Sequence, residues 1–428
     1  IDPATRRNLE LLTSLDGRRQ GSLLAVIDRT ATGAGARLLA ERLAAPLASL
    51  EPIQARLAEV TGFVTDGAAR DGCRERLKGV PDIARALSRL VIGRGGPRDL
   101  RALATGLAAA RTLQAGLNAR EPALAGLAAR ITDTTALVTR LDELLDDSPP
   151  HLARDGGFIR TGAVPELDEL RALRDQGRRH IAALETRYRD ETGIPSLKIR
   201  HNNMLGFFIE VTATHARKVP ETFHQRQGMV NASRFGTAEL TALEQKISTA
   251  ADQALALELA LFETLRGEVL AAGEAIAATA RALAEIDVAA ALAVLAVEAD
   301  WVAPVLTEGL DLRIEGGRHP VVETALAAER QRFVANDCRL EGEERLWLLT
   351  GPNMAGKSTF LRQNALIVVL AQMGSYVPAK AATLGLVDKL FSRVGAADDL
   401  ARGQSTFMVE MVETATILNQ AGERSFVI

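Results

Sequence analysis

The segment Gly351–Ser358 reads GPNMAGKS and fits the pattern G-x-x-x-x-G-K-[ST] at every fixed position. Glycines at both ends of such a loop allow backbone N–H groups to curl around a triphosphate, and a following helix adds a favourable dipole. In this pattern Lys357 reaches the β and γ phosphates and Ser358 binds Mg²⁺. The flanking sequence fits, because residues 346–349 (LWLL) predict a short buried strand and Thr359–Met373 predicts a helix. The alternative, a glycine-rich turn between buried elements, gives no reason for a lysine at the mouth of the loop.

Length and composition indicate what kind of protein carries this loop. The chain has 428 residues, 47% of them hydrophobic, which predicts more than one domain with sizeable cores. Aromatic residues are few and alanine and leucine dominate, which favours helices over a β-rich fold. The net charge of −3 does not indicate a polyanionic partner, so any nucleic-acid surface must be a local patch. Cys73 and Cys338 lie far apart, which argues against a disulfide framework or a zinc site and for a reducing compartment. Neither a membrane span nor a signal peptide is expected.

The remaining sequence suggests a helical protein with a small insertion. Helical spacing of apolar residues and short breaks predict a series of helices up to about residue 145, and a long charged helix over residues 166–191. Strand-like composition follows in residues 191–245, above all in Gly206–Val211. A second long helix, over residues 238–283, predicts an antiparallel arm with a β-containing tip, although an ordinary helical domain with an embedded hairpin is the alternative. From Trp301 the pattern becomes α/β, with strands predicted at Pro320–Val322, at residues 346–349 and, as the start of a buried strand, at residues 425–428.

The insertion is mildly basic in an otherwise acidic chain. Its cations are Lys198, Arg200, Arg217, Lys218, Arg226, Arg234 and Lys246. Such a tip, with asparagine and glutamine donors beside the cations, would bind phosphates without reading sequence. The alternative is a solvated charged surface with no ligand.

Several longer sequence motifs resemble those of the MutS family of DNA mismatch-repair ATPases, in its bacterial mismatch-recognition branch. They are Gly317–Pro320 (GRHP), Thr350–Thr359 (TGPNMAGKST), Gly374–Pro378 (GSYVP), Arg393–Leu400 (RVGAADDL) and Ser405–Met411 (STFMVEM), together with the opening Thr5–Glu10 (TRRNLE) and the strand Gly206–Val211. The resemblance covers essentially the whole chain. It implies a multidomain α plus α/β fold, in which a helical core carries long lever helices, a small β-containing clamp and an ABC-like P-loop nucleotide-binding domain. The implied parts are residues 1–190 (core and outgoing lever), 191–245 (clamp), 246–300 (returning lever) and 301–428 (nucleotide-binding domain, expected to stop at the start of the Walker B strand).

The resemblance also implies roles for single residues. Gly351, Pro352, Asn353, Met354, Ala355, Gly356, Lys357, Ser358, Thr359 and Phe333 would bind ATP, with Ser358 holding Mg²⁺ and Phe333 packing on the adenine unless it is a plain core residue. Lys357 would neutralise charge on the γ-phosphate, and Asn353 would position water or phosphate. Ser405 would reach the partner's γ-phosphate across a dimer, or else cap its helix, or do both. Asp398 and Asp399 are not expected to replace the acidic pair that follows Walker B in the family. Ala355 and Val230 depart from the residues expected at their positions, and Val230 puts some phosphate contacts of the clamp in doubt.

At the level of function, the resemblance implies an ATP-regulated clamp on mismatched double-stranded DNA, with ATP and Mg²⁺ as cofactors. Lys198, Arg200, Arg226, Asn231 and Arg234 are the expected DNA contacts. A homodimer, a MutL-type repair partner, no membrane contact and a bacterial cytoplasmic, nucleoid-associated location are implied with it. Two alternatives are open: a catalytically dead fragment that binds DNA and ATP, and a related P-loop ATPase with long arms.

Overall fold

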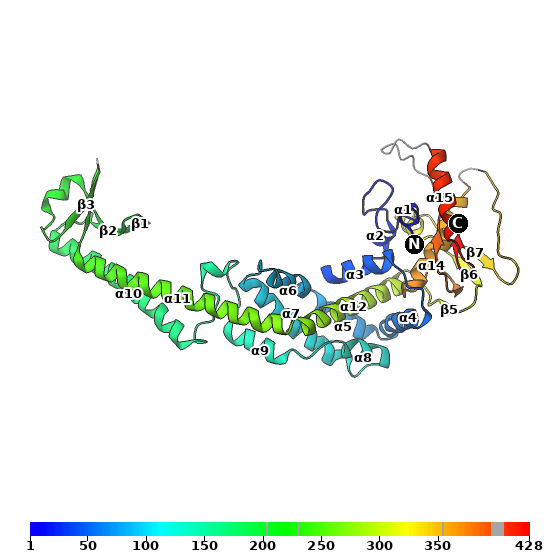
Figure 1. Ribbon diagram of the computed structural model, residues 1–428, viewed down its shortest axis with the longest axis horizontal. Coiled ribbons are helices and arrows are strands. Elements are labelled where there is room, and N and C mark those ends of the chain that lie inside the picture. Colours follow the sequence, from blue (N-terminus) through cyan, green and yellow to red (C-terminus); the bar gives the residue numbers. More distant parts are fainter. Residues whose placement is uncertain (203, 230, 353–354, 395–405) are drawn as a thin grey trace. The chain divides into compact units, whose positions relative to one another are not determined.

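A computed structural model describes residues 1–202, 204–229, 231–352, 355–394 and 406–428, apart from the side chains of residues 178 and 406–410 (Figure 1). Its packing divides the chain into two compact units. The first unit holds residues 1–85, 105–134 and 274–428, and the second holds residues 86–104 and 135–273. The sequence-based borders at residues 190, 245 and 300 follow another principle of division and stay predictions.

The second unit is built on two long helices that run side by side, α10 (Pro165–Thr192) and α11 (Ala238–Ala271) (Figure 1). Pro165 and two acidic residues in the first turn favour the start of α10, and Gly193, with a φ of 63°, ends it in the left-handed conformation. Thr237 caps α11 by accepting from the N–H of Leu240. The second predicted helix ends earlier than expected, at Ala271, and α12 (Gly273–Glu298) follows it. Periodicity missed this break because the apolar stripe continues through both helices.

The small sheet lies between these helices in the sequence. Its strands are β1 (Lys198–Asn202), β2 (Gly206–Thr212), β3 (His224–Gly228) and β4 (Ala232–Gly236), antiparallel in the order β1-β2-β4-β3. One face of the sheet carries Ile209, Val211 and Phe235 into a core shared with Ile181 and Leu184 of α10. Because side chains alternate along a strand, Phe208, Glu210 and Arg234 lie on the other, outer face. The predicted β-containing insertion is therefore confirmed. The other elements of this unit are α9 (Thr135–Leu144) and the 3-10 helices η1 (Ala153–Asp155) and η2 (Ala213–Lys218).

The helical part of the first unit consists of short helices around the alanine-rich α12, most of which is buried. Asp287 of α12 is fully buried and accepts from the N–H groups of Ala31 and Thr32, both at 2.8 Å, and from the Thr32 hydroxyl at 2.6 Å. Thr32 in turn caps the next helix, so this carboxylate fixes a helix start from 255 residues away. The helices are α1 (Pro3–Asn8), α2 (Leu23–Ile27), α3 (Gly33–Ala44), α4 (Leu50–Thr65), α5 (Gly67–Leu77) and α8 (Pro122–Ala129), while α6 (Ile83–Val91) and α7 (Pro97–Leu117) include residues of both units.

The α/β part of the first unit contains two small sheets. One has the order β5-β8-β6-β7, and the other is the parallel pair β9–β10. The elements are β5 (Val305–Thr307), β6 (Leu312–Gly317), α13 (Pro320–Ala328), β7 (Asn336–Leu340), α14 (Lys357–Gln372), β8 (Ala381–Gly385), β9 (Leu390–Phe391), α15 (Thr406–Gln420) and β10 (Phe426–Val427). The predicted organisation, mostly helical with small sheets, is thus confirmed at this level.

Three strand predictions in this region need correction. Pro320–Val322 forms the first turn of α13, because proline suits that position and His319 caps the helix. Residues 346–349 form no strand, and Leu346 and Leu348 are 87% and 88% exposed, since no described strand hydrogen-bonds to them. The strand expected at residues 425–428 exists as β10, but it is half-buried to exposed rather than buried.

Candidate nucleotide site and basic sheet

The predicted phosphate loop leads directly into α14. Gly356 precedes the helix with a φ of 87°, a left-handed conformation that glycine adopts at little cost. Among the described residues no side chain caps this helix start, so the N–H groups of its first turn are available to an anionic ligand. The geometry fits the phosphate groups of a nucleotide. Asn353 and Met354 lie outside the described residues.

Lys357 and Ser358 occupy the first turn of α14. The half-buried Lys357 donates from Nζ to the carbonyl oxygens of Pro352, at 2.9 Å, and Gly351. The ammonium group is therefore held over the loop by neutral acceptors, which phosphate oxygens would replace with charge-assisted bonds. Ser358 is exposed and Thr359 is half-buried. The set of one cation, one exposed hydroxyl and free backbone N–H groups suits a magnesium–nucleotide complex.

The other residues predicted for this site are less closely tied to the loop. Phe333 is half-buried in the irregular segment before β7, and no ring contact of Phe333 is found in the described part of the chain. Ser405, Asp398 and Asp399 lie outside the described residues. Sequence reasoning missed Trp347, whose ring stacks on Phe360 of α14 with centroids 6.3 Å apart and an interplanar angle of 6°. A tryptophan just before the loop was the available signal.

The body of α14 packs against β6 through a close contact. Gln363 is fully buried, and a Cβ atom at Gly317 would lie 2.6 Å from its Nε2. A side chain at this position of the GRHP motif would force Gln363 and Ile314 to shift, which explains the glycine there. At the far end of the helix, Arg56 donates to the carbonyl of Met373 at 3.3 Å, and Gln372 bonds to the backbone of Leu47. The helix that carries Lys357 is thus held along its body and at its C-terminal end within the first unit.

His319 lies in the same GRHP word and is buried. Its Nδ1 accepts from the N–H of Val322, so the ring acts as a neutral helix cap. Burial, and then the positive charge of Arg362, lower the pKa of His319 to about 4. The fold therefore opposes protonation of this ring.

Lowering the pH from 7 to 4 is expected to reduce the free energy of unfolding through His319. The unfolded chain takes up a proton below about pH 6.5 while the folded ring resists it down to about pH 4, so stability is full above pH 6.5 and falls as the pH drops. The loss is about 3 kcal/mol, from 1.36 kcal/mol per pKa unit. Urea unfolding at several pH values checks it against His319→Asn, which keeps a cap acceptor but does not titrate. An unchanged pH dependence in that variant would contradict the assignment.

Of the cations predicted to contact DNA, Lys198, Arg200 and Arg234 lie on the outer face of the small sheet, whereas Arg226 of β3 is directed to α11. Arg200 pairs with Glu210 at 3.1 Å, and Arg234 lies 3.8 Å from the same carboxylate. Arg234 also covers the ring of Phe208, with its guanidinium carbon 4.5 Å from the centroid. Arg226 donates to the carbonyl of Leu205 and to the Thr241 hydroxyl, at 2.9 and 3.0 Å. These three arginines help to hold the sheet together, which sequence reasoning did not show.

Lys198 and Asn231 differ from these arginines. Both are exposed, and within the described ranges the Lys198 ammonium has no hydrogen-bond or ion-pair partner. Lys198 stands opposite Glu210 in the β1–β2 register, so it belongs to the same outer face. Val230 lies outside the described residues. Of the five predicted contacts, Lys198 has the cation most readily available to a phosphate.

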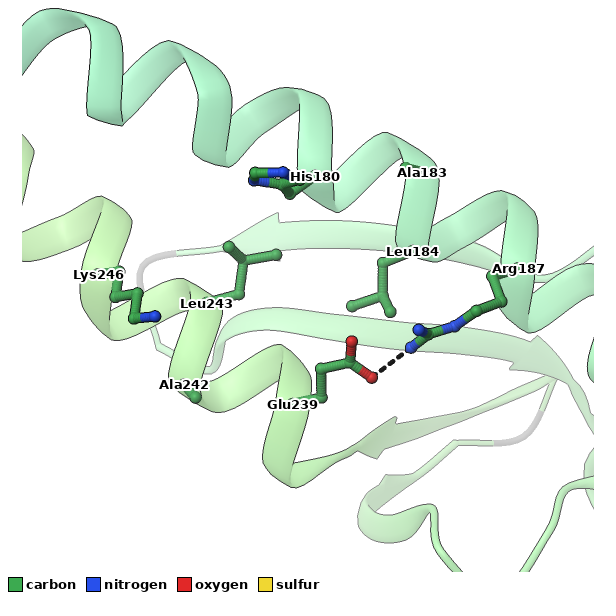
Figure 2. A pocket seen from close by; sticks show the side chains of 8 residues that line it. All are labelled: His180, Ala183, Leu184, Arg187, Glu239, Ala242, Leu243 and Lys246. Carbon is green, nitrogen blue, oxygen red and sulfur yellow. Dashed lines mark hydrogen bonds and ion pairs between the residues drawn. The ribbon is translucent and has the colours of Figure 1, made fainter.

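A shallow groove of about 380 Å³ lies between α10 and α11 (Figure 2). One part of its wall is an ion pair between Arg187 of α10 and Glu239 of α11. His180 and Leu184 line the groove from α10, and Leu243 and Lys246 line it from α11. This ion pair joins one residue of each helix at the surface and contributes little to stability, but it engages Arg187 within the protein.

Two other features are absent from the residues that the structure describes. These residues contain no group of three or more histidine, cysteine or acidic side chains placed to hold a metal ion. None of their helices is long and apolar enough to cross a membrane.

Comparison with known proteins identifies the family. Residues 4–293 match the family model described as MutS domain III, and residues 347–428 match that of MutS domain V. The DNA mismatch repair protein MutS of Dinoroseobacter shibae is 56% identical over 436 residues, an alignment that covers 100% of this chain and 50% of that protein. The chain thus spans about half the length of the curated relative it matches. With a domain III match over more than half of its length, the chain belongs to the MutS family.

Proposed function

We propose that this chain is the ATP-regulated, DNA-gripping part of a mismatch-repair protein. The observation that carries the proposal is the uncapped start of α14, where Gly356 adopts a left-handed conformation and Lys357 lies over the loop. A nucleoside triphosphate supplies oxygens for the N–H groups of this helix start and charged acceptors in place of the two carbonyls that Lys357 now contacts. The name of the Dinoroseobacter shibae relative supports mismatch repair as the setting.

At the nucleotide site, each residue has a defined task in this proposal. The backbone of Gly351–Thr359 cradles the phosphates, Lys357 exchanges its two carbonyl acceptors for phosphate oxygens, and the Ser358 hydroxyl holds Mg²⁺. When bound, magnesium neutralises charge on the phosphates. Phe333 flanks the adenine, and Asn353 positions water or phosphate.

The assembly follows from the same proposal. A second copy of the chain places Ser405 against the γ-phosphate of its neighbour, so that ATP favours the closed dimer. The lever helices transmit closure to the small sheets, which hold mismatched double-stranded DNA, and a MutL-type protein then binds the complex. Such coupling requires two arrangements of the dimer that differ in ATP affinity.

Replacing Lys198 with alanine is expected to weaken DNA binding through a lost phosphate contact. Lys198 has no ion-pair partner among the described residues, so its charge is available to a phosphate, and each such contact releases condensed counterions. The slope of log affinity against log salt should fall by about one, equally for matched and mismatched duplexes. Fluorescence anisotropy of a labelled duplex over a salt series measures this slope.

Arg187→Ala provides the matched control. It removes a cation of the same unit that is already paired with Glu239, so its salt slope should stay close to that of the unchanged protein. Arg234→Ala is unsuitable, because this residue covers Phe208 and its loss disturbs the sheet. An unchanged slope in Lys198→Ala would contradict the proposed contact between DNA and the outer face of the sheet at Lys198.

A further inference from the structure

Glu10 has a backbone conformation that needs an explanation. Its φ of 50° is left-handed, which is uncommon for a residue other than glycine, asparagine or aspartate. Such conformations persist where the surroundings over-determine them, and they cluster at functional sites. Here the carbonyl of Glu10 accepts from the N–H of Leu23 at 3.0 Å, and its Oε1 accepts from the N–H of Leu15 at 2.8 Å. These bonds fix both the backbone and the direction of the carboxylate.

The second carboxylate oxygen reaches the P-loop helix. Oε2 of Glu10 lies 3.3 Å from a guanidinium nitrogen of Arg362, a residue 352 positions further along the chain. Arg362 follows Lys357 by five residues on α14, which corresponds to a rise of about 7.5 Å. The Arg362 side chain is mostly buried, and its positive charge helps to lower the pKa of the buried, neutral His319. Glu10 therefore supplies a counter-charge where an unpaired guanidinium would be poorly solvated.

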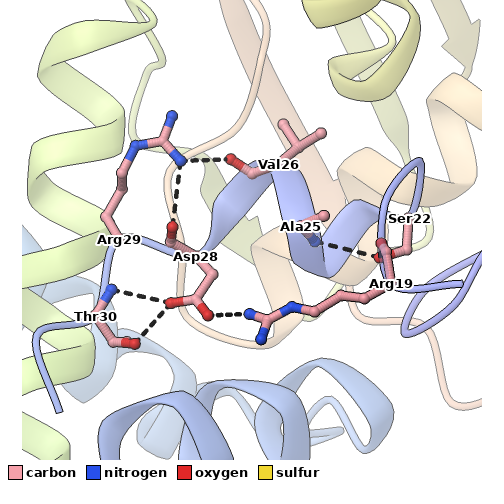
Figure 3. Close-up of polar contacts among 7 residues, drawn as sticks. All are labelled: Arg19, Ser22, Ala25, Val26, Asp28, Arg29 and Thr30. Atoms are coloured by element: carbon pink, nitrogen blue, oxygen red, sulfur yellow. Dashed lines mark hydrogen bonds and ion pairs between the residues drawn. The ribbon is translucent and has the colours of Figure 1, made fainter. Parts of the chain in front are cut away.

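The segment around Glu10 is anchored on both sides. Before it, Asn8 donates to the carbonyl of Ser392 at 2.9 Å, and the N–H of Ser392 donates to Thr5, so the segment is also attached to the residue after β9. After it, Arg19 pairs with Asp28, which also accepts from Thr30 (Figure 3). Burial alone would raise the pKa of Asp28, but the bonds from Thr30 and Arg19 outweigh it and lower the pKa. Glu10 thus lies in a braced segment.

We propose that Glu10 is a positioning residue for the nucleotide site, which holds Arg362 and thereby sets the placement of Lys357 and Ser358 at the start of α14. The inference rests on the proposed function of α14 as the ATP site. In this arrangement the braced segment around Glu10 holds α14 through Arg362, and a movement of that segment changes nucleotide affinity.

The test compares variants of the protein at its full natural length. Glu10→Gln should weaken binding of a fluorescent ADP analogue roughly five- to ten-fold, the lower part of the usual range for coupled sites. The KM for ATP should rise by a similar factor with kcat little changed. The charge-swapped pair Glu10→Arg with Arg362→Glu should recover most of the affinity, which a general loss of stability would not allow.

Two further variants separate the ion pair from backbone strain and from local stability. Glu10→Gly accepts the left-handed φ without strain but lacks the carboxylate, so it should bind the analogue as weakly as Glu10→Gln. Asp16→Asn breaks an exposed ion pair with Arg18 that takes no part in this bracing, and it should leave analogue binding unchanged. If the unchanged protein binds no nucleotide, the proposed function itself fails. If it binds and Glu10→Gln binds equally well, the positioning role is wrong.

Discussion

Replacing Asp287 with alanine is expected to lower the free energy of unfolding of the first unit by about 4 kcal/mol, since each orphaned buried donor costs about 1–3 kcal/mol. The carboxylate is fully buried and accepts three hydrogen bonds, from the N–H groups of Ala31 and Thr32 and from the Thr32 hydroxyl. Alanine offers no acceptor to any of these three donors. The start of α3 would lose its link to α12.

Urea unfolding followed by circular dichroism measures this effect. Asp287→Asn serves as the control, because it keeps the shape and one carbonyl acceptor, and it should lose about half as much stability. Equal losses in the two variants would point to the negative charge rather than the bonds. A loss below about 1 kcal/mol in the alanine variant would show that the contact is not important for stability.

Replacing Lys357 with methionine is expected to weaken ATP binding about a hundred-fold, as a hydrogen bond to a charged group contributes about 1.5–3 kcal/mol. Methionine keeps the length and apolar character of the side chain but has no ammonium group to meet the phosphates. The fold should not change, because the two carbonyls that Lys357 now contacts belong to exposed loop residues.

Isothermal titration with Mg²⁺–ATP measures this loss. The titration is paired with a melting curve to show that the variant is folded. Arg187→Ala, which lies in the second unit, is the matched control for removal of one positive charge and should bind ATP as before. Unchanged affinity in the methionine variant would mean that the nucleotide, if bound at all, lies elsewhere.

Local features of the fold were predictable from sequence. Helix α14, the two long helices of the second unit and the strand at Gly206–Val211 each depend on residues close together in the chain. Periodicity, caps and glycine positions carry this information. The strand predicted at residues 346–349 is absent from the structure. A strand needs a hydrogen-bonding partner strand, and apolar composition alone does not reveal whether one is present.

The candidate site was predictable only in part. The loop residues follow from the motif, but the support behind them comes from pairs far apart in sequence, such as Glu10 with Arg362. Similarly, Arg234 was predicted as a DNA contact from its charge, whereas its position over Phe208 depends on the register of β2 and β4. Composition identifies a basic surface. Only the packing distinguishes cations that are bonded within the sheet from a cation such as Lys198, which is available to a phosphate.

The most direct test of the account is the rate at which the protein at its full natural length leaves a mismatched duplex, with and without ATP. Stopped-flow measurement on a labelled duplex compares the unchanged protein with Lys357→Met. The account predicts that ATP changes the dissociation rate of the unchanged protein and has no effect on the variant. An equal ATP effect in both proteins, or none in the unchanged protein, would contradict the claim that nucleotide at α14 controls the grip on DNA.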